Sequence, residues 1–303
     1  GCLTHCAWPK YRGICMTTHH NLLALKNYVA PVALSMTVLM VIPASAGAQA
    51  AAADLLTGKL VITGSSTLAP LVAEIGKRFE SLYPTVRIDV QSGGSSRGIA
   101  DARQGLSDIG MVSRAMKEDE RDLSAFPVAR DGVCIILHRD NPVRALTDNQ
   151  VVAIYTGKIT NWNAVGGTDA PITVVTKAEG RSTLEVFLRY FTLKNVDVKA
   201  HVVIGDNEQG VKTVAGNRHA IGYVSIGTAE YDAVHGVPIQ LLPIKGIAAS
   251  TENVRKGIFP LSRPLHIVTR TPPSDLAKAF IEYAQSKAVH DLINQQYFVP
   301  LAD

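Results

Sequence analysis

Three segments of the sequence combine glycine with hydroxyl residues where a strand pattern gives way to a helix pattern. They are residues 64–68 (Gly-Ser-Ser-Thr-Leu), 92–98 (Ser-Gly-Gly-Ser-Ser-Arg-Gly) and 179–184 (Glu-Gly-Arg-Ser-Thr-Leu). The first turn of a helix leaves backbone N–H groups unpaired and carries partial positive charge, so it favours an anion. Small residues let a ligand approach those N–H groups, and hydroxyls add donors. One such turn indicates only a capped helix, but three in one chain favour an oxyanion site.

If the three turns converge, a tetrahedral oxyanion receives many hydrogen bonds in a cleft that excludes water. Charge-assisted hydrogen bonds contribute roughly 1.5 to 3 kcal/mol each, which suffices for micromolar or tighter binding. The neighbouring charges also have plainer interpretations. Arg97 and Arg114 fit a surface position equally well, and Lys177 and Glu179 fit an ion pair at a loop rim. Asp108 fits a structural hydrogen-bond acceptor better than a ligand, because an anion beside it would raise its pKa at a cost.

An enzyme is the weaker alternative for the same residues. A serine hydrolase needs a base and an orienting acid, but the Gly-x-Ser-x-Gly match at residues 94–98 belongs to one of the three turns, and the histidines after residue 50 lie in no recognisable motif. A metal-dependent phosphatase needs clustered metal ligands, whereas the acidic run at 118–122 is interrupted by Arg121 and follows Lys117, as on a solvated helix. We therefore expect no catalytic residue, no metal and no cofactor, and we expect Cys134 to be a buried, unreactive thiol.

The elements that position these turns alternate along the chain between short β-branched runs and helical patterns. The first helix shows the pattern plainly, because apolar residues three and four apart extend from Leu68 to Leu82 before Pro84. The alternation predicts a parallel sheet covered by helices. Strands are expected at 60–63, 87–90, 109–112, 133–137, 172–176, 202–204, 221–224 and 265–269, and helices at 68–82, near 99, and at 149–155, 183–191 and 274–286.

The first 50 residues have the layout of an export signal. They contain Lys10, Arg12 and Lys26, no acidic residue, and an apolar run at 29–42 that is followed by small residues. We expect residues 1–48 to be an upstream segment and a signal peptide that starts at Met16, with a retained membrane anchor as the alternative. Their removal lowers the formal net charge from +4 to about +1, so nucleic-acid binding loses its support.

Six motifs, at residues 64–67, 93–98, 107–110, 154–162, 177–180 and 220–224, follow one another in an order that carries a family resemblance. In them the sequence resembles the periplasmic phosphate-binding proteins of ABC importers over nearly all of residues 57–300, and the stretch at 154–162 is the most specific. The resemblance implies an α/β, two-lobed periplasmic-binding-protein (venus-flytrap) fold, each lobe a mostly parallel sheet flanked by helices. The two crossovers would lie near 138–142 and 259–264. One lobe would be 55–138 plus 260–303, and the other 139–259.

The resemblance also implies a ligand set for phosphate. The matching positions are Ser66, Thr67, Leu68, Ser95, Ser113, Lys177, Arg181, Ser182 and Thr183, with Leu68 contributing only its backbone N–H. Two positions depart from the family pattern. Ser113 stands where the family places an aspartate that accepts the proton of hydrogen phosphate. Lys177 stands where it places an arginine, and Arg181 is expected to supply the guanidinium.

The function that the resemblance implies is capture of inorganic phosphate and its delivery to an inner-membrane ABC permease by a monomeric periplasmic protein. Because Ser113 replaces the aspartate, another tetrahedral oxyanion such as sulfate, molybdate or tungstate remains the main alternative. A secreted hydrolase or phosphatase, or a signalling protein on the same scaffold, is a further alternative.

Overall fold

The computed structural model describes residues 56–301, so the expected signal segment at 1–48 lies outside the described residues. Within residues 56–301, no helix is long and apolar enough to cross a membrane. The strands are β1 (Gly58–Gly64), β2 (Val86–Ser92), β3 (Ile109–Val112), β4 (Ser124–His138), β5 (Thr173–Lys177), β6 (Val202–Ile204), β7 (Ala220–Ser225), β8 (Ile239–Leu241), β9 (Ser262–Thr269) and β10 (Val299–Pro300).

Helices follow most of these strands. They are α2 (Ala69–Leu82), α3 (Ser95–Gln104), α4 (Asp148–Tyr155), α5 (Ser182–Tyr190), α6 (Asn207–Ala215), α7 (Ile226–Val234), α8 (Thr251–Arg255), α9 (Asp275–Ala284) and α10 (His290–Gln295), with 3-10 turns η1 (Glu118–Glu120), η2 (Trp162–Val165), η3 (Asn195–Asp197) and η4 (Lys287–Val289). The expected α/β alternation is therefore present, and the predicted bounds of β3 and β6 coincide with the observed ones.

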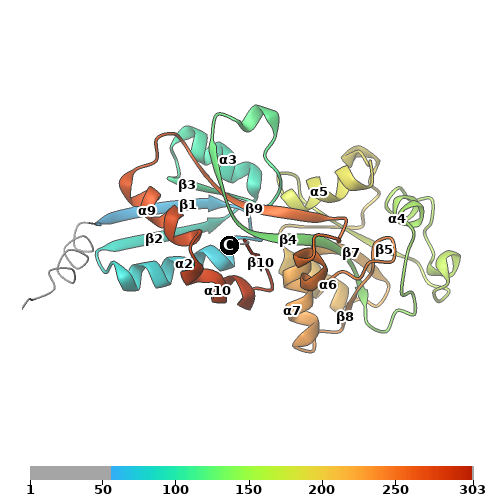
Figure 1. Cartoon of the computed structure of the whole chain (residues 1–303). Coiled ribbons are helices and arrows are strands. Elements are labelled where there is room, and N and C mark those ends of the chain that lie inside the picture. Colours follow the sequence, from blue (N-terminus) through green and yellow to red (C-terminus); the bar gives the residue numbers. More distant parts are fainter. Residues whose placement is uncertain (1–55, 302–303) are drawn as a thin grey trace, which may run out of the picture. The chain divides into compact units, whose positions relative to one another are not determined.

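One sheet with the order β2-β1-β3-β9-β4-β7-β5-β6 runs through the described residues, and β8 and β10 also pair with β4. Its outer parts are parallel, because β1 pairs in parallel with β2 and β3, and β5 with β6 and β7. The middle is antiparallel, through β3–β9, β9–β4 and β4–β7. Figure 1 shows β4 and β9 running side by side between the two outer parts.

Strand β4 divides the sheet into two halves. Its residues 124–132 pair with β9, whereas its residues from Val133 to Leu137 pair with β7. The two segments also enter different hydrophobic cores: Val128 and Ala129 pack in the core of the first half, and Val133 in the core of the second. The change of core therefore lies within β4 itself, because one uninterrupted strand serves both halves.

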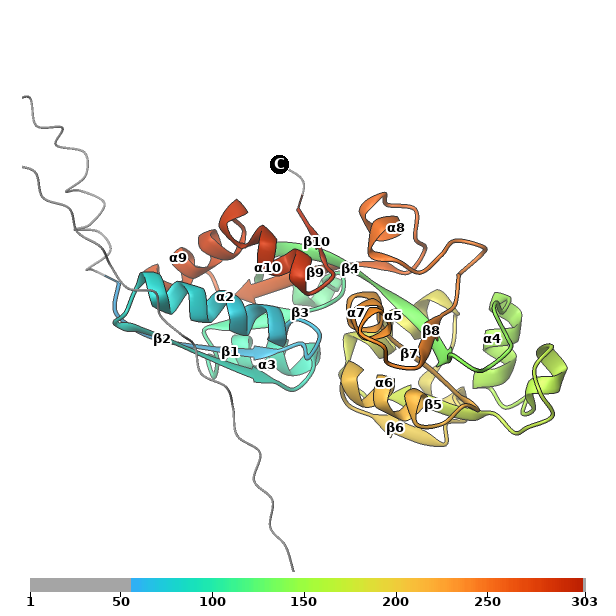
Figure 2. The same ribbon diagram turned by 90° about the horizontal axis from the view of Figure 1, so that it is seen from below.

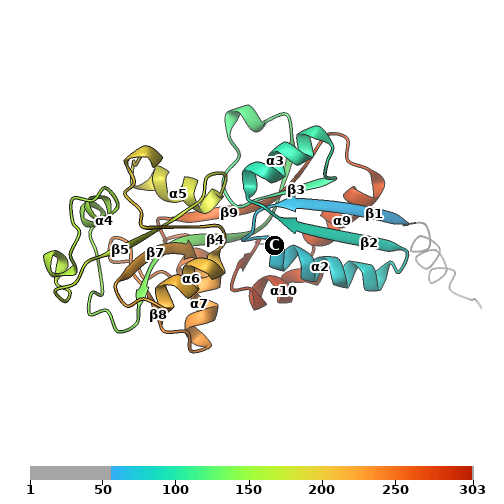
Figure 3. The same ribbon diagram turned by 180° about the vertical axis from the view of Figure 1, so that it is seen from behind.

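Helices cover both faces of each half. In Figures 1 and 3, α3 and α5 lie on one side of the sheet and α2, α6 and α7 on the other, and Figure 2 shows the second side from below. Most of the apolar stripe predicted for α2 is the buried face of that helix, with Leu71, Ile75 and Phe79 at most 1% exposed, but Leu82 at its end is 52% exposed. In the second half, the rings of Phe187 and Tyr223 stack with centroids 3.9 Å apart.

Glycine is required where β1 turns into the first Gly/Ser segment. Gly64 has φ of +131°, and a Cβ on it would lie 2.4 Å from the Met111 carbonyl oxygen. A Cβ on Gly98 in α3 would lie 2.8 Å from the Thr63 oxygen, which is also a backbone atom. These two glycines let α3 approach the ends of β1 and β3 closely, and they thereby fix the position of the second Gly/Ser segment.

Candidate anion-binding site

The three turns singled out in the sequence lead into α2, α3 and α5, and in none of these helices does the side chain of the N-cap residue cap the helix. Their N-cap residues are Leu68, Gly94 and Arg181, and none accepts a side-chain hydrogen bond from the helix. The other described helices of at least eight residues, α4, α6, α7 and α9, all have a capping serine, threonine or aspartate. The N-termini of α2, α3 and α5 therefore receive no cap from their own N-cap side chains. Ser65 Oγ accepts from the Leu68 N–H and the Gly180 carbonyl accepts from the Ser96 N–H, so an external acceptor depends on the first-turn N–H groups that remain.

The N-terminal ends of these helices meet around one small cavity between the two halves of the sheet. It has about 10 Å³ of space for the centre of a water-sized sphere. In a tetrahedral oxyanion the four oxygen atoms lie at covalent distance from one central atom. The centres of these oxygens therefore occupy only a few cubic ångströms, and the cavity volume is counted for sphere centres in the same way. The lining residues are Ser65, Ser66, Thr67, Gly94, Ser95, Ser113, Lys177, Arg181, Ser182, Thr183 and Gly205.

Eight of the nine residues carried over from the resemblance line this cavity, and Leu68 does not. The Leu68 side chain is buried in the first core, and its backbone N–H donates to Ser65 Oγ at 3.2 Å. The Leu68 N–H is therefore already engaged by the protein. Ser65, Gly94 and Gly205 line the cavity but were not predicted as ligands, although the first two belong to the Gly/Ser segments.

Hydroxyl groups form one connected wall of the cavity. Ser65 Oγ donates to Ser113 Oγ at 2.9 Å, and the Ser113 backbone N–H donates to Ser95 Oγ at 3.2 Å. The hydroxyl of Ser182 is buried and has no partner among the described residues. A buried polar group without a partner is costly, so a ligand that accepts a hydrogen bond from Ser182 would stabilise the site.

Lys177 supplies a buried amine rather than a surface charge. Its side chain is 3% exposed, and Nζ donates to Asn207 Oδ1 at 2.8 Å. Burial lowers the pKa of Lys177 to about 7; the positive charges of Arg263 and Arg181 add to this effect and Asp206 opposes it. The loop-rim pair with Glu179 is not formed, because Glu179 Oε1 instead accepts from Asn195 Nδ2.

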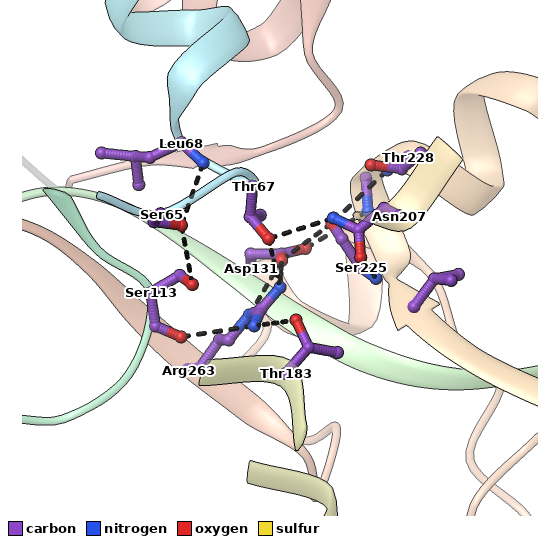
Figure 4. A network of polar contacts seen from close by, with 12 residues as sticks. Ser65, Thr67, Leu68, Ser113, Asp131, Thr183, Asn207, Ser225, Thr228 and Arg263 are labelled. Atoms are coloured by element: carbon purple, nitrogen blue, oxygen red, sulfur yellow. Dashed lines mark hydrogen bonds and ion pairs between the residues drawn. The ribbon is translucent and has the colours of Figure 1, made fainter. Parts of the chain in front are cut away.

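Arg263, which the sequence analysis did not single out, reaches the cavity residues from β9. It forms an ion pair with Asp131 of β4 at 2.8 Å and donates to Thr183 Oγ1 at 2.9 Å and to Thr67 Oγ1 at 3.4 Å. Figure 4 shows its guanidinium between the two threonines. Asn207 was missed as well, although it donates from Nδ2 to Thr67 Oγ1 at 3.0 Å.

The remaining charged candidates have structural roles outside the cavity. Arg97 forms an ion pair with Asp101 on the surface of α3 at 3.0 Å. Arg114 is 1% exposed, so the surface interpretation of this residue is wrong; it forms ion pairs with Glu120 and Glu185. Asp108 Oδ2 accepts from the Val61 backbone N–H at 2.7 Å, which is the structural role expected for it.

Groups that could support catalysis are few in the part of the chain that the structure describes. No three histidine, cysteine, aspartate or glutamate side chains come together there as metal ligands. Cys134 is buried, and burial raises the pKa of its thiol well above the usual value. Its thiol is therefore a poor nucleophile.

Comparison with known proteins places these observations in a family. A family model described as a PBP superfamily domain matches residues 45–288. The chain is 29% identical over 252 residues to the phosphate-binding protein PstS of Bacillus subtilis, and the alignment covers 82% of each chain.

Solved structures give the same picture. A phosphate ABC transporter substrate-binding protein from Clostridium perfringens, with bound phosphate, is 32% identical with a TM-score of 0.75, covering 81% of this chain and 100% of that chain. An ABC-type phosphate transport receptor from Vibrio cholerae is 30% identical with a TM-score of 0.68, covering 80% and 100%. The family resemblance and the two-lobed α/β fold predicted from the sequence are thus confirmed. The chain belongs to the PBP superfamily, and its relatives there include the PstS proteins.

Proposed function

We propose that this protein captures inorganic phosphate between two lobes and delivers it to an ABC-type permease. The observation that carries the proposal is the convergence of three helix N-termini without a cap from the N-cap side chain, from both halves of the sheet, on one small cavity that contains the unpartnered Ser182 hydroxyl. Such a site offers an anion many donors and partial positive charge. The relatives named for binding phosphate support the same ligand, and they support a binding protein rather than an enzyme.

The proposed lobes correspond to the two halves of the sheet. Because β4 changes core near Val133 and β9 begins at Ser262, we assign residues 56–132 plus 262–301 to one lobe and 133–261 to the other. Closure of these lobes would bring Thr67, Ser95 and Ser113 of the first lobe to Lys177, Ser182 and Thr183 of the second. The anion would then lose its contact with water, which strengthens each hydrogen bond to it.

Delivery to a permease requires a protein outside the cytoplasm. The signal-peptide pattern of residues 1–48 and the ABC transport relatives support an extracytoplasmic location and an inner-membrane permease as partner. We also propose that the carrier is a monomer.

The proposal is tested by isothermal titration of the purified protein, unfolded and refolded to remove any carried-over ligand, with phosphate and with sulfate at pH 6 and pH 8. Tight binding of phosphate without heat from sulfate is expected. Absence of phosphate binding at both pH values would refute the proposed function while leaving the fold unaffected.

Sulfate is the second candidate, and one observation favours it. The described residues that line the cavity include no aspartate or glutamate. A carboxylate there would accept the proton of hydrogen phosphate and repel a fully ionised anion. Sulfate binding at least as tight as phosphate binding in the same titration would establish this alternative.

Arg181 provides a single-residue test of the site. It lines the cavity beside Ser182, so Arg181→Ala should weaken phosphate binding about tenfold, since a charged donor to a buried anion contributes about 1.4 kcal/mol or more. Arg97→Ala is the matched control, because Arg97 lies in the first turn of α3 but outside the cavity. Equal affinities for the two variants would remove Arg181 from the site.

A further inference from the structure

The two strands that pass between the lobes carry a buried ion pair. Asp131 of β4 lies directly opposite Arg263 of β9 in the antiparallel ladder, and both side chains are 1% exposed. The Arg263 Nε and Nη2 groups donate to Asp131 Oδ2 at 3.0 and 2.8 Å. The carboxylate also accepts from Ser225 Oγ at 2.8 Å and from the Gly227 N–H at 3.2 Å. The Asp131 carboxylate therefore fixes the position of the Arg263 guanidinium, and the acceptor sites of that carboxylate are occupied.

The other donors of Arg263 reach two hydroxyl groups, one from each lobe, and the Ser113 carbonyl oxygen at 3.3 Å. Nη1 donates to Thr183 Oγ1 in α5 of the second lobe, and Nη2 reaches Thr67 Oγ1 just before α2 of the first. A guanidinium donates and never accepts. Each threonine oxygen must therefore act as an acceptor toward Arg263; dashed lines in Figure 4 mark these contacts.

This arrangement determines the direction in which the two hydroxyl protons point. Thr67 Oγ1 accepts from Asn207 Nδ2 as well as from Arg263, so both of its lone pairs are used and only its proton remains. Arg263 uses one lone pair of Thr183 Oγ1, so the proton of this hydroxyl cannot point toward the guanidinium. Both threonines line the cavity, whereas Arg263 and Asp131 do not. The protons are therefore left for an acceptor inside the cavity.

We propose that Arg263, held by Asp131, is a positioning residue that makes Thr67 and Thr183 hydrogen-bond donors toward the bound oxyanion, one from each lobe. The inference rests on the proposed anion-binding function and adds a residue that acts through its neighbours. Because one guanidinium serves hydroxyls of both lobes, it contributes fully only when the lobes are closed.

A double-mutant cycle tests the proposal with phosphate as the probe. Arg263→Lys keeps a cation beside Asp131 but cannot reach both hydroxyls, and Thr183→Val removes one of them at similar size. Each single change is expected to weaken phosphate binding about tenfold, as for one hydrogen bond to a charged group. If Arg263 acts through Thr183, the double variant should lose clearly less than the product of the two single losses.

Arg263→Lys combined with Ser182→Ala is the matched control cycle. Ser182 lines the same cavity but has no bond to Arg263, so these two losses should multiply. The proposal is overturned if Arg263→Lys binds phosphate as the parent protein does, or if the Thr183 cycle multiplies like the Ser182 cycle. A parent protein that binds no phosphate would instead refute the proposed function.

Thermal unfolding shows whether the Arg263 variant is folded. If it is not, Thr67→Val and Thr183→Val test the inference with Arg263 in place, and each is expected to lower phosphate affinity roughly fivefold or more. Unchanged affinity in both valine variants would overturn it.

Discussion

The amine of Lys177 lies against the anion cavity with an amide, not a carboxylate, as its partner. Burial lowers its pKa to about 7, helped by Arg263 and Arg181 and opposed by Asp206. The ammonium is therefore charged below pH 7 and largely neutral above it. A bound anion favours the charged form and raises the pKa, so above pH 7 the binding of an anion takes up a proton.

This linkage predicts a pH dependence that sulfate isolates, because sulfate does not titrate near neutrality. Any affinity for sulfate should fall up to about tenfold per pH unit above pH 7, as expected for uptake of one proton. Titration calorimetry in buffers of different ionisation enthalpy measures that uptake directly. Lys177→Arg is the control, since a guanidinium stays charged and should remove the dependence. The same slope in Lys177→Arg would assign the proton to another group.

At the scale of elements, the close approach of α3 to β1 and β3 holds the second Gly/Ser segment at the cavity. A Cβ on Gly98 would lie 2.8 Å from the Thr63 oxygen and 2.9 Å from the Met111 oxygen. Both are backbone atoms that cannot turn aside, so Gly98→Ala has to displace the helix.

We expect Gly98→Ala to lower the free energy of unfolding by about 1 to 3 kcal/mol, the usual cost of overpacking, and to weaken anion binding through Ser95. Urea denaturation and titration calorimetry measure the two effects. Gly216→Ala at the end of α6 is the control, because a Cβ there would lie 3.2 Å from the Lys212 carbonyl oxygen and its φ of −85° suits alanine. Equal unfolding free energies for the two variants would contradict the packing argument.

At the scale of the whole described molecule, charges near the cavity join the two lobes. Glu185 of α5 in the second lobe forms ion pairs with Arg114 at 3.0 Å and with Lys117 at 2.7 Å, and both cations belong to the first lobe. Arg114 is also held by Glu120 at 2.7 Å. These contacts require the lobes to be close, so they stabilise the closed form relative to an open one.

Glu185→Gln should therefore weaken phosphate binding by roughly threefold to tenfold, as for the loss of a partly buried ion pair, without changing a cavity residue. Titration calorimetry gives the affinity, and small-angle scattering of the ligand-free protein should show a more open form. Glu118→Gln is the control, because Glu118 pairs with Arg121 within the first lobe. An affinity equal to that of the parent protein would show that these ion pairs do not contribute to closure.

Much of the fold and part of the site follow from local pattern. The bounds of β3 and β6, the buried stripe of α2 and the three Gly/Ser turns were predictable, because hydrophobic period and helix-start chemistry depend on residues a few positions apart. The resemblance then identified eight residues that line the cavity. The first part of β4 was missed, since Pro127, Arg130 and Asp131 break the apolar pattern of a buried strand.

The sequence by itself determined the class of fold, the family and the kind of ligand donors. Only the tertiary structure decided that Asp131 and Arg263, 132 positions apart, face each other and that Arg263 donates to Thr67 and Thr183. It also decided that Arg114 is buried and that Leu68 is turned away from the cavity. The physical reason is that a buried charge is tolerated only with a partner. The register between β4 and β9 places Arg263 beside Asp131. This register pairs residues far apart in the chain, so no local sequence pattern predicts it.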